Sequence, residues 1–251
     1  MIKAMNQIPE IKWEAAQVPF NEWVGLDQLW LLMTSAAHEF SISYCYGEPK
    51  NPPWLQFTAL TEMRFPITGP ITATSRLSDR PVVARPNQPI HLPSGEHITL
   101  FVGTTLWLEL TRGRDLLLDL PLARLSDTWF GPNTREGEVC YACPTHARLS
   151  MEGIAANPYK AITPVEIRNQ ADSPLVMDQF NLPVPYLALY RDDDRHWTSK
   201  VTITRTSADS RGEVKIATSA PPFCRSPVEL SVPRRRSEGG MIHKALNLLL
   251  G

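Results

Sequence analysis

Apolar and polar residues alternate along several stretches of this chain. Apolar side chains stand at every second position on Phe40, Ile42, Tyr44 and Tyr46, with serines between the first three. A period of two predicts a half-buried strand. The apolar run 29–33 precedes it, so the pattern predicts a hairpin that turns at residues 35–37. The alternative is a helix from Asp27 to Glu39.

Short strand-like segments recur through the rest of the chain. The further strands predicted are 54–59, 97–102, 105–110, 116–119, 162–168, 175–180, 186–190, 197–205 and 213–218. Turn-spaced strands of this kind are typical of sandwiches and barrels. No strand–helix–strand rhythm appears, which argues against a parallel α/β sheet. The pattern therefore predicts an all-β, mostly antiparallel protein.

Prolines mark an expected division of the chain. Pro81, Pro86, Pro89 and Pro93 follow one another closely, and proline favours turns and strand ends. We expect two packed β-sandwich-like units, residues 1–80 and 81–232. Residues 233–251 are expected to form a basic linker and a short amphipathic helix.

The terminal segment has its own candidate role. Arg234, Arg235 and Arg236 precede an apolar stretch, Gly240–Leu250, that is predicted to be helical. Such a short helix is unstable alone in water, so it must pack on its own unit, a second copy, a partner or a lipid surface. Arg234, Arg235 and Arg236 are candidates for docking to a partner, with only weak peripheral contact to an anionic membrane. The alternative is that the helix packs its apolar face on its own unit.

Composition narrows the class of protein. The chain has 251 residues, of which 43% are hydrophobic and 20% charged, with 23 prolines and a net charge of −1. These values describe an ordinary globular protein, and proline above the usual ~5% argues against a helical one. No positive field is available to hold nucleic acid. Neither a signal-peptide pattern nor a membrane-spanning apolar run occurs, so we expect a cytoplasmic protein.

The cysteines leave three interpretations open. Cys140 and Cys143 have the spacing of a redox pair or half a zinc site, for which Cys45, Cys224 and His146 would be the remaining ligands. Pro144 follows, so the pair appears on a strand that leads into a turn. Residues three apart on a strand point to opposite faces. This favours structural cysteines, and four reduced thiols are predicted.

Other candidate chemistry is sparse. The segment Arg191–Arg195 gathers carboxylates but is most simply a solvated hairpin tip, and His91 and His97 could face each other across a hairpin. No nucleophile elbow, phosphate loop or dinucleotide fingerprint occurs. The sequence therefore favours a protein that is not an enzyme, with no catalytic residues, metal ligands or cofactor assigned. An enzyme whose residues converge from distant strands stays open.

The most distinctive segment runs from Arg124 to Cys143. It concentrates aromatic residues, glycines and a proline without a helical period. Aromatic side chains beside arginines are typical interface anchors. The candidate binding patch consists of Arg124, Asp127, Trp129, Phe130 and Arg135. The alternative is that these aromatics only plug one end of a sandwich.

The same segment resembles a known family. Arg124–Pro132 and Gly137–Ala142, together with Phe101–Trp107 and Ile162–Ile167, are similar to a prokaryotic family of uncharacterised proteins, a "domain of unknown function" group. The resemblance implies a loose association with genes for mechanosensitive channels, and no functional residues follow from it.

Two functions from different classes follow from the sequence. The favoured hypothesis is a non-catalytic interaction or accessory protein that binds a protein partner, such as a membrane channel or a second copy. The alternatives are a metal- or thiol-dependent enzyme that uses the Cys140 and Cys143 region, or a small-ligand-binding module.

Overall fold

The structure is a computed structural model. It describes residues 21–35, 39–48, 60–66, 71–131, 133, 135–152, 154–192, 195–207, 212–236 and 241–246; the side chains of residues 35, 143–146 and 241–246 are not described. The chain forms two compact units: the first is Met1–Arg76 with Leu106–Arg124, and the second is Leu77–Thr105 with Leu125–Gly251. The division of the chain into separate domains at residues 80 and 232 stays a prediction.

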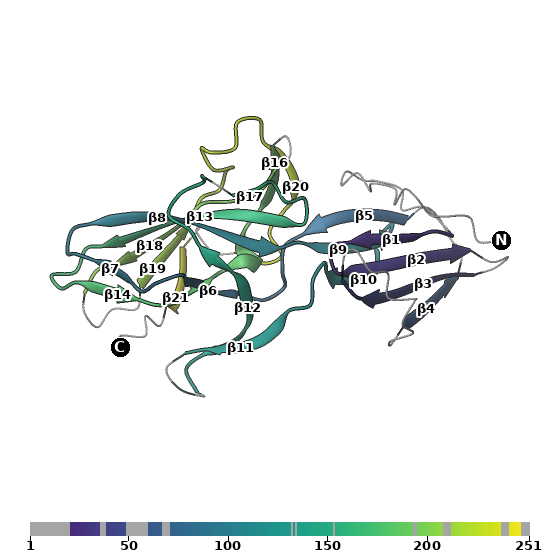
Figure 1. Ribbon diagram of the computed structural model, residues 1–251, viewed down its shortest axis with the longest axis horizontal. Helices are drawn as coiled ribbons and strands as arrows, with labels where there is room; N and C mark the ends of the chain where they lie inside the picture. The colour runs from purple at the N-terminus through teal and green to yellow at the C-terminus, as the bar shows by residue number, and fades with distance from the viewer. Residues whose placement is uncertain are drawn as a thin grey trace. The chain divides into compact units, whose positions relative to one another are not determined.

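The first unit contains two antiparallel sheets (Figure 1). One has the order β1-β2-β3-β4, and the other has the order β10-β9-β5. Their strands are β1 Trp23–Leu26, β2 Leu29–Ser35, β3 Glu39–Tyr46, β4 Thr61–Pro66, β5 Ile71–Arg76, β9 Trp107–Arg112 and β10 Asp115–Pro121. The predicted hairpin is confirmed, because β2 pairs with β3 along its whole length, and the alternative helix is wrong.

Strand β2 lies at the centre of the first unit's core. Leu29, Trp30, Leu31 and Met33 are all buried, so this strand is covered on both faces and its sequence is an unbroken apolar run. Trp30 pairs across the ladder with Gly25, and a Cβ at Gly25 would lie 2.9 Å from ring carbons of Trp30. Glycine is therefore required where the indole crosses the neighbouring strand.

The second unit is built around one large sheet. Its order is β20-β16-β17-β13-β18-β19-β21, and β8 also pairs with β13. A second sheet has the order β11-β12-β6-β15, and a third pairs β14 with β7. The strands are β6 Val82–Pro86, β7 Ile90–Leu92, β8 His97–Thr105, β11 Ser126–Phe130, β12 Glu138–Ala147, β13 Lys160–Asn169, β14 Leu175–Met177, β15 Phe180–Leu182, β16 Leu189–Asp192, β17 Arg195–Thr198, β18 Val201–Arg205, β19 Gly212–Ile216, β20 Val228–Ser231 and β21 Met241–Leu246.

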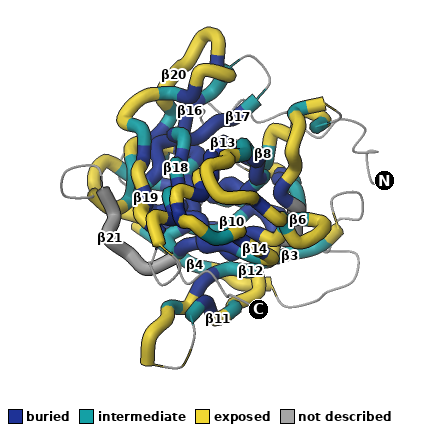
Figure 2. The backbone as a smooth tube through the Cα atoms, turned by 90° about the vertical axis from the view of Figure 1, so that its left-hand side faces the viewer, coloured by how far each residue is buried: buried dark blue, intermediate teal, exposed yellow. Residues whose placement is uncertain are grey.

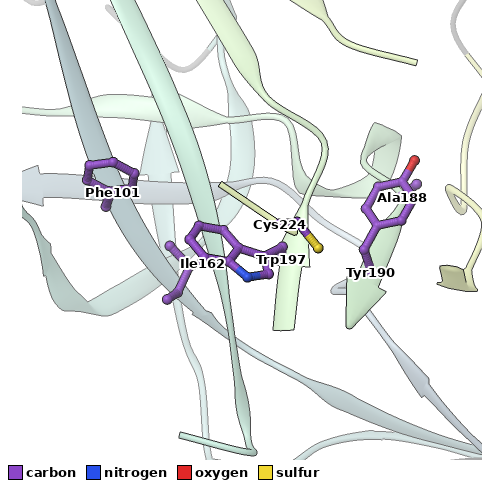
Figure 3. Close-up of a cluster of buried hydrophobic side chains, with 6 residues drawn as sticks. All are labelled: Phe101, Ile162, Ala188, Tyr190, Trp197 and Cys224. Carbon is purple, nitrogen blue, oxygen red and sulfur yellow. The ribbon is translucent and has the colours of Figure 1, made fainter. Parts of the chain in front are cut away.

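Strand β13 organises this sheet. It pairs with β8 in an antiparallel ladder and runs parallel to β17 with its first half and to β18 with its second. Most of its residues are buried (Figure 2). On one face, Ile162 packs with Trp197 in a cluster completed by Phe101, Ala188, Tyr190 and Cys224 (Figure 3). The parallel pairs were not predicted, since no helix links them in the sequence.

Several predicted segments differ in detail. The range 197–205 contains two strands, β17 and β18, and 186–190 contains the end of a 3-10 helix, Val184–Tyr186, before β16. The predicted strand 54–59 lies outside the described residues. Within the described residues, no helix is long and apolar enough to cross a membrane.

The predicted terminal helix is not seen. Met241–Leu246 instead forms β21, which pairs antiparallel with β19, with Val214 opposite Ile242. A helix of about ten residues gains little stability by itself. An unpaired edge of β19 can satisfy the backbone of this segment, so pairing decides its conformation.

Candidate functional site

The distinctive segment after Arg124 folds as a β-hairpin. Strands β11 and β12 pair antiparallel without irregularity, with Trp129 opposite Val139 and Asp127 opposite Tyr141. These four side chains share one face because successive strand residues alternate. Figure 1 shows the hairpin extending away from the β13 sheet. We call this face the outer hairpin face.

Two glycines shape the turn of the hairpin. Gly131 has a φ of +155°, and a Cβ there would meet the carbonyl oxygen of Glu136. A Cβ at Gly137 would lie 2.7 Å from ring carbons of Trp129 and from the carbonyl oxygen of Phe130. Only glycine permits such close approach of backbone and ring.

Asn133 forms hydrogen bonds both within the turn and to the indole of Trp129. Its side-chain oxygen accepts backbone N–H bonds from Arg135 at 2.9 Å and Glu136 at 3.0 Å. Its carbonyl oxygen accepts a bond from Trp129 Nε1 at 3.2 Å. Trp129 is nevertheless 44% exposed, and Val139 opposite it is 45% exposed. The hairpin therefore presents a large aromatic side chain in a held orientation.

Arg80 forms the polar border of the outer hairpin face. Its Nη1 lies 3.2 Å from Asp127 Oδ1 and its Nε lies 3.8 Å from Asp79 Oδ2. The guanidinium carbon lies 5.3 Å from the ring centroid of Tyr141, within range of a cation–π contact. Tyr141 donates its hydroxyl hydrogen to Asp79 Oδ1 at 3.0 Å.

Tyr141 is a hydrogen-bond donor rather than a base. Burial, and then the bond to Asp79, raise the pKa of Tyr141 to about 12. Its hydroxyl therefore stays protonated at neutral pH. The border contributes charge, an aromatic ring and a fixed donor to the outer hairpin face, which suits recognition of another molecule better than proton transfer.

The predicted docking arginines meet the same segment. Arg234 donates from Nε to the carbonyl oxygen of Leu77 at 2.6 Å, and Arg235 donates from Nη2 to that of Asp79 at 3.4 Å. The backbone N–H of Arg235 also bonds Pro185 at 2.9 Å. Arg236 is exposed. Arg234 and Arg235 therefore lie beside the segment that carries Arg80, the residue at the border of the outer hairpin face.

The candidate patch predicted from the sequence is only partly assembled. Asp127 and Trp129 lie on the outer hairpin face and Arg135 lies in its turn. Phe130 points to the opposite face, where it is 2% exposed and packs with Val83 and Cys140. Arg124 belongs to the first unit, where its guanidinium carbon lies 5.6 Å from the ring centroid of Tyr46.

Sequence reasoning missed Asp79, Arg80, Val139 and Tyr141. Val139 and Tyr141 alternate with Cys140, so strand periodicity could have identified them as one face. Asp79 and Arg80 carry no such signal, because they reach the hairpin only through the pairing of β12 with β6.

Cys140 is a structural thiol in this fold. It is fully buried, and its Sγ lies 3.6 Å from the carbonyl oxygen of Glu138 and 3.9 Å from Asn181 Oδ1. Strand β12 continues past Pro144 to Ala147, so the predicted turn there is wrong. The side chain of Cys143 lies outside the described residues.

The other cysteines are protected as well. Cys45 and Cys224 are buried and free. Burial, and then Asp192, raise the pKa of Cys224 to about 11, and burial raises the pKa of Cys45. In the described part of the chain, no three His, Cys, Asp or Glu side chains lie close enough to hold a metal ion.

The remaining sequence candidates do not assemble. His91 lies on β7 and His97 on β8, but β7 pairs with β14 and β8 with β13, so the predicted hairpin between them is wrong. Asp192 accepts the backbone N–H of Arg225 at 2.7 Å, and residues 193 and 194 lie outside the described residues.

A polar hollow lies elsewhere on the second unit. It has a volume of about 230 Å³ and is lined by Gly95, Glu96, His97, Glu166, Arg168 and Gln170. Glu166 Oε2 lies 2.8 Å from Lys200 Nζ and 3.0 Å from Arg168 Nη2. Burial opposes ionisation of Glu166, but the bonds from Lys200 and Arg168 outweigh it and lower its pKa. The carboxylate is therefore neutralised by its own neighbours.

Comparison with known proteins agrees with the resemblance noted above. No curated protein and no solved structure matched the chain. The model of one family, described as "Protein of unknown function (DUF432)", matches residues 27–249, which include parts of both units and the outer hairpin face. The chain therefore belongs to the DUF432 family.

Proposed function

We propose that this chain is a non-catalytic protein-interaction module whose partner binds the outer hairpin face. The observation that carries the proposal is the exposure of Trp129 in a held orientation, 44% exposed yet bonded through Nε1 to Asn133. A large exposed aromatic residue normally lowers the solubility of a protein without stabilising its fold. Tryptophan, tyrosine and arginine are also the residues that dominate binding energy at interfaces.

Rigidity of the surface supports the same proposal. Binding loses free energy for every side chain that must be ordered. Here Trp129 is held by Asn133 and by contact with Gly137, and Arg80 is held between Asp127 and the Tyr141 ring. Little further ordering is needed when a partner docks.

The kind of partner follows from the chemistry of the face. It combines an apolar centre, Trp129 and Val139, with a border of paired charges. This suits a folded protein surface, and a membrane protein such as a channel is the partner class we propose. Arg235 and Arg236, exposed beside the same segment, would support contact at the membrane surface.

The test is capture of a partner with matched variants. Trp129→Ser and Val139→Ser should each reduce retention of the partner at least tenfold, a loss of about 1.4 kcal/mol of binding free energy. Tagged wild-type and variant chains would be used as bait in soluble and detergent-solubilised membrane fractions of the native host. The melting temperature of each variant would be measured in parallel, so that loss of the partner is not mistaken for loss of the fold.

The control is Leu149→Ser. Leu149 is 65% exposed and lies outside the hairpin, so its replacement removes a similar apolar area without touching the outer hairpin face. A partner that is retained equally by the wild type, Trp129→Ser and Leu149→Ser would contradict the proposal.

A further inference from the structure

Strand β11 is an open edge of its sheet. Among the described strands it pairs with β12 alone, and Ser126 and Asp127 are exposed. An edge strand presents backbone N–H and C=O groups that fit another extended chain. Proteins usually block such edges with proline, lysine, bulges or very short strands.

The usual protections are weak on β11. Its only charged residue, Asp127, is paired with Arg80 at 3.2 Å, and its ladder with β12 has no bulge. By contrast, the opposite edge of the same sheet, β15, has three residues and is followed by Pro183. Edge strand β4 of the first unit carries Glu62, Arg64 and Pro66.

The sequence of β11 is complementary to itself. If two copies pair antiparallel about a two-fold axis so that all five residues are used, Thr128 faces the partner's Thr128. Asp127 then faces the partner's Trp129, and Ser126 faces the partner's Phe130. Threonine pairs stabilise cross-strand contacts, and no like charges stand opposite each other.

The same register covers the exposed aromatic residue. Trp129 and the partner's Trp129 become diagonal neighbours on the outer hairpin face, a spacing of about 7–8 Å that large rings can bridge. A shift by two residues that placed Asp127 opposite the partner's Asp127 would set two carboxylates against each other and leave β11 partly unpaired. The register that places Thr128 opposite the partner's Thr128 is therefore the favoured one.

We infer that β11 pairs with β11 of a second copy of this chain and joins the two four-stranded sheets into one. This inference rests on the proposed function, because it names a second copy as one partner of the outer hairpin face. Closed two-fold pairing uses the same strand on both chains, so it ends at a dimer and leaves no further β11 edge open.

Sedimentation equilibrium of the full chain tests the dimer. Across a series from micromolar to near-millimolar protein, the wild type should approach twice its mass of 28.2 kDa. Trp129→Ser should weaken association at least tenfold, while Leu149→Ser should leave it unchanged. A wild-type chain that stays monomeric throughout the series would overturn the inference.

Disulfide trapping tests the register. In antiparallel strands, directly opposite Cα atoms lie about 4.5–5.5 Å apart, within the range of about 4.4–6.8 Å that a disulfide spans. Thr128 also lies opposite Cys140 within the hairpin, so both native thiols of the hairpin are removed first. In a Cys140→Ala and Cys143→Ser background, Thr128→Cys should therefore form an intermolecular disulfide under mild oxidation. In the control, Ser126→Cys, the Cα atoms of the two cysteines would lie four residues apart along the ladder, a distance of about 14 Å. This variant should not cross-link.

The outcomes separate the two proposals. A dimer that cross-links through residue 126 but not 128 would overturn the β11 register. A monomer whose capture of another protein still depends on Trp129 would overturn self-pairing and leave the proposed function standing. If the wild type neither self-associates nor captures another protein through Trp129, the proposed function is overturned as well.

Discussion

Replacing Arg205 by methionine is expected to lower the free energy of unfolding by about 3 kcal/mol. Arg205 is 3% exposed. Its Nη1 donates to the carbonyl oxygens of Ser173 at 3.0 Å and Pro174 at 3.2 Å, and its Nη2 donates to Ser173 Oγ at 3.1 Å. Methionine fills similar space but donates nothing, so buried acceptors would lose their partners.

Asn169 shares the task of holding this loop. It is fully buried, and its Nδ2 donates to the carbonyl oxygens of Leu92, Pro93 and Ser173. Arg205 Nη1 lies 3.4 Å from Asn169 Oδ1. The two side chains therefore connect the end of β13 to the segment after β7, and the loss of Arg205 should also loosen the loop that contains Ser173.

Urea unfolding measures this effect, with Arg168→Met as the control. The Arg168 side chain is 47% exposed and pairs with Glu166, which keeps Lys200 as a second partner. Its loss should cost less than about 1 kcal/mol. Equal destabilisation by the two substitutions would show that Arg205 contributes no more than a surface arginine.

Lowering the pH from about 7 to about 4 is expected to remove about 3 kcal/mol of stability through His196 alone. Burial, and then the charge of Arg191, lower the pKa of His196 from 6.5 to about 4. The unfolded chain therefore binds a proton between these pH values while the folded chain does not. Stability is full above about pH 6.5 and falls as the pH falls towards 4.

The structure explains why the charged form is disfavoured. His196 is 3% exposed, faces Arg191 across the β16–β17 ladder, and neither of its ring nitrogens has a hydrogen-bond partner within the described residues. A proton there would place a second positive charge in the core without an acceptor.

His196→Leu separates this effect from the titration of carboxylates. The variant should be as stable as the wild type near pH 7, because leucine removes two unpartnered polar atoms, and it should gain about 3 kcal/mol relative to the wild type by pH 4. Chemical denaturation at several pH values measures the difference. His97→Leu, at an exposed position of β8, is the control for replacing a histidine by leucine. Parallel curves for the wild type and His196→Leu would contradict the assignment.

The all-β class and the β2–β3 hairpin could be predicted from the sequence because they depend on the local alternation of apolar and polar residues. The β2–β3 pairing follows from an unbroken apolar run beside an alternating one, and both patterns reflect burial of strand faces. The segment after Arg124 stood out for a related reason. Its glycines and aromatics are needed where Gly137 lies against the Trp129 ring, and such close approach restricts residue choice.

Long-range pairing, by contrast, was decided only by the tertiary structure. Leu106–Arg124 belongs to the first unit, Met241–Leu246 pairs with β19, and β13 runs parallel to β17 and β18. Each arrangement depends on which strand edge is available for pairing. Backbone hydrogen bonds form between residues of any type, so the pattern of side chains does not reveal which strands pair. The same holds for Arg80 beside Tyr141 and for buried Arg205 and His196. From the sequence alone, polar side chains are expected at the surface. They lie in the interior only where segments distant in the sequence supply hydrogen-bond acceptors or exclude water.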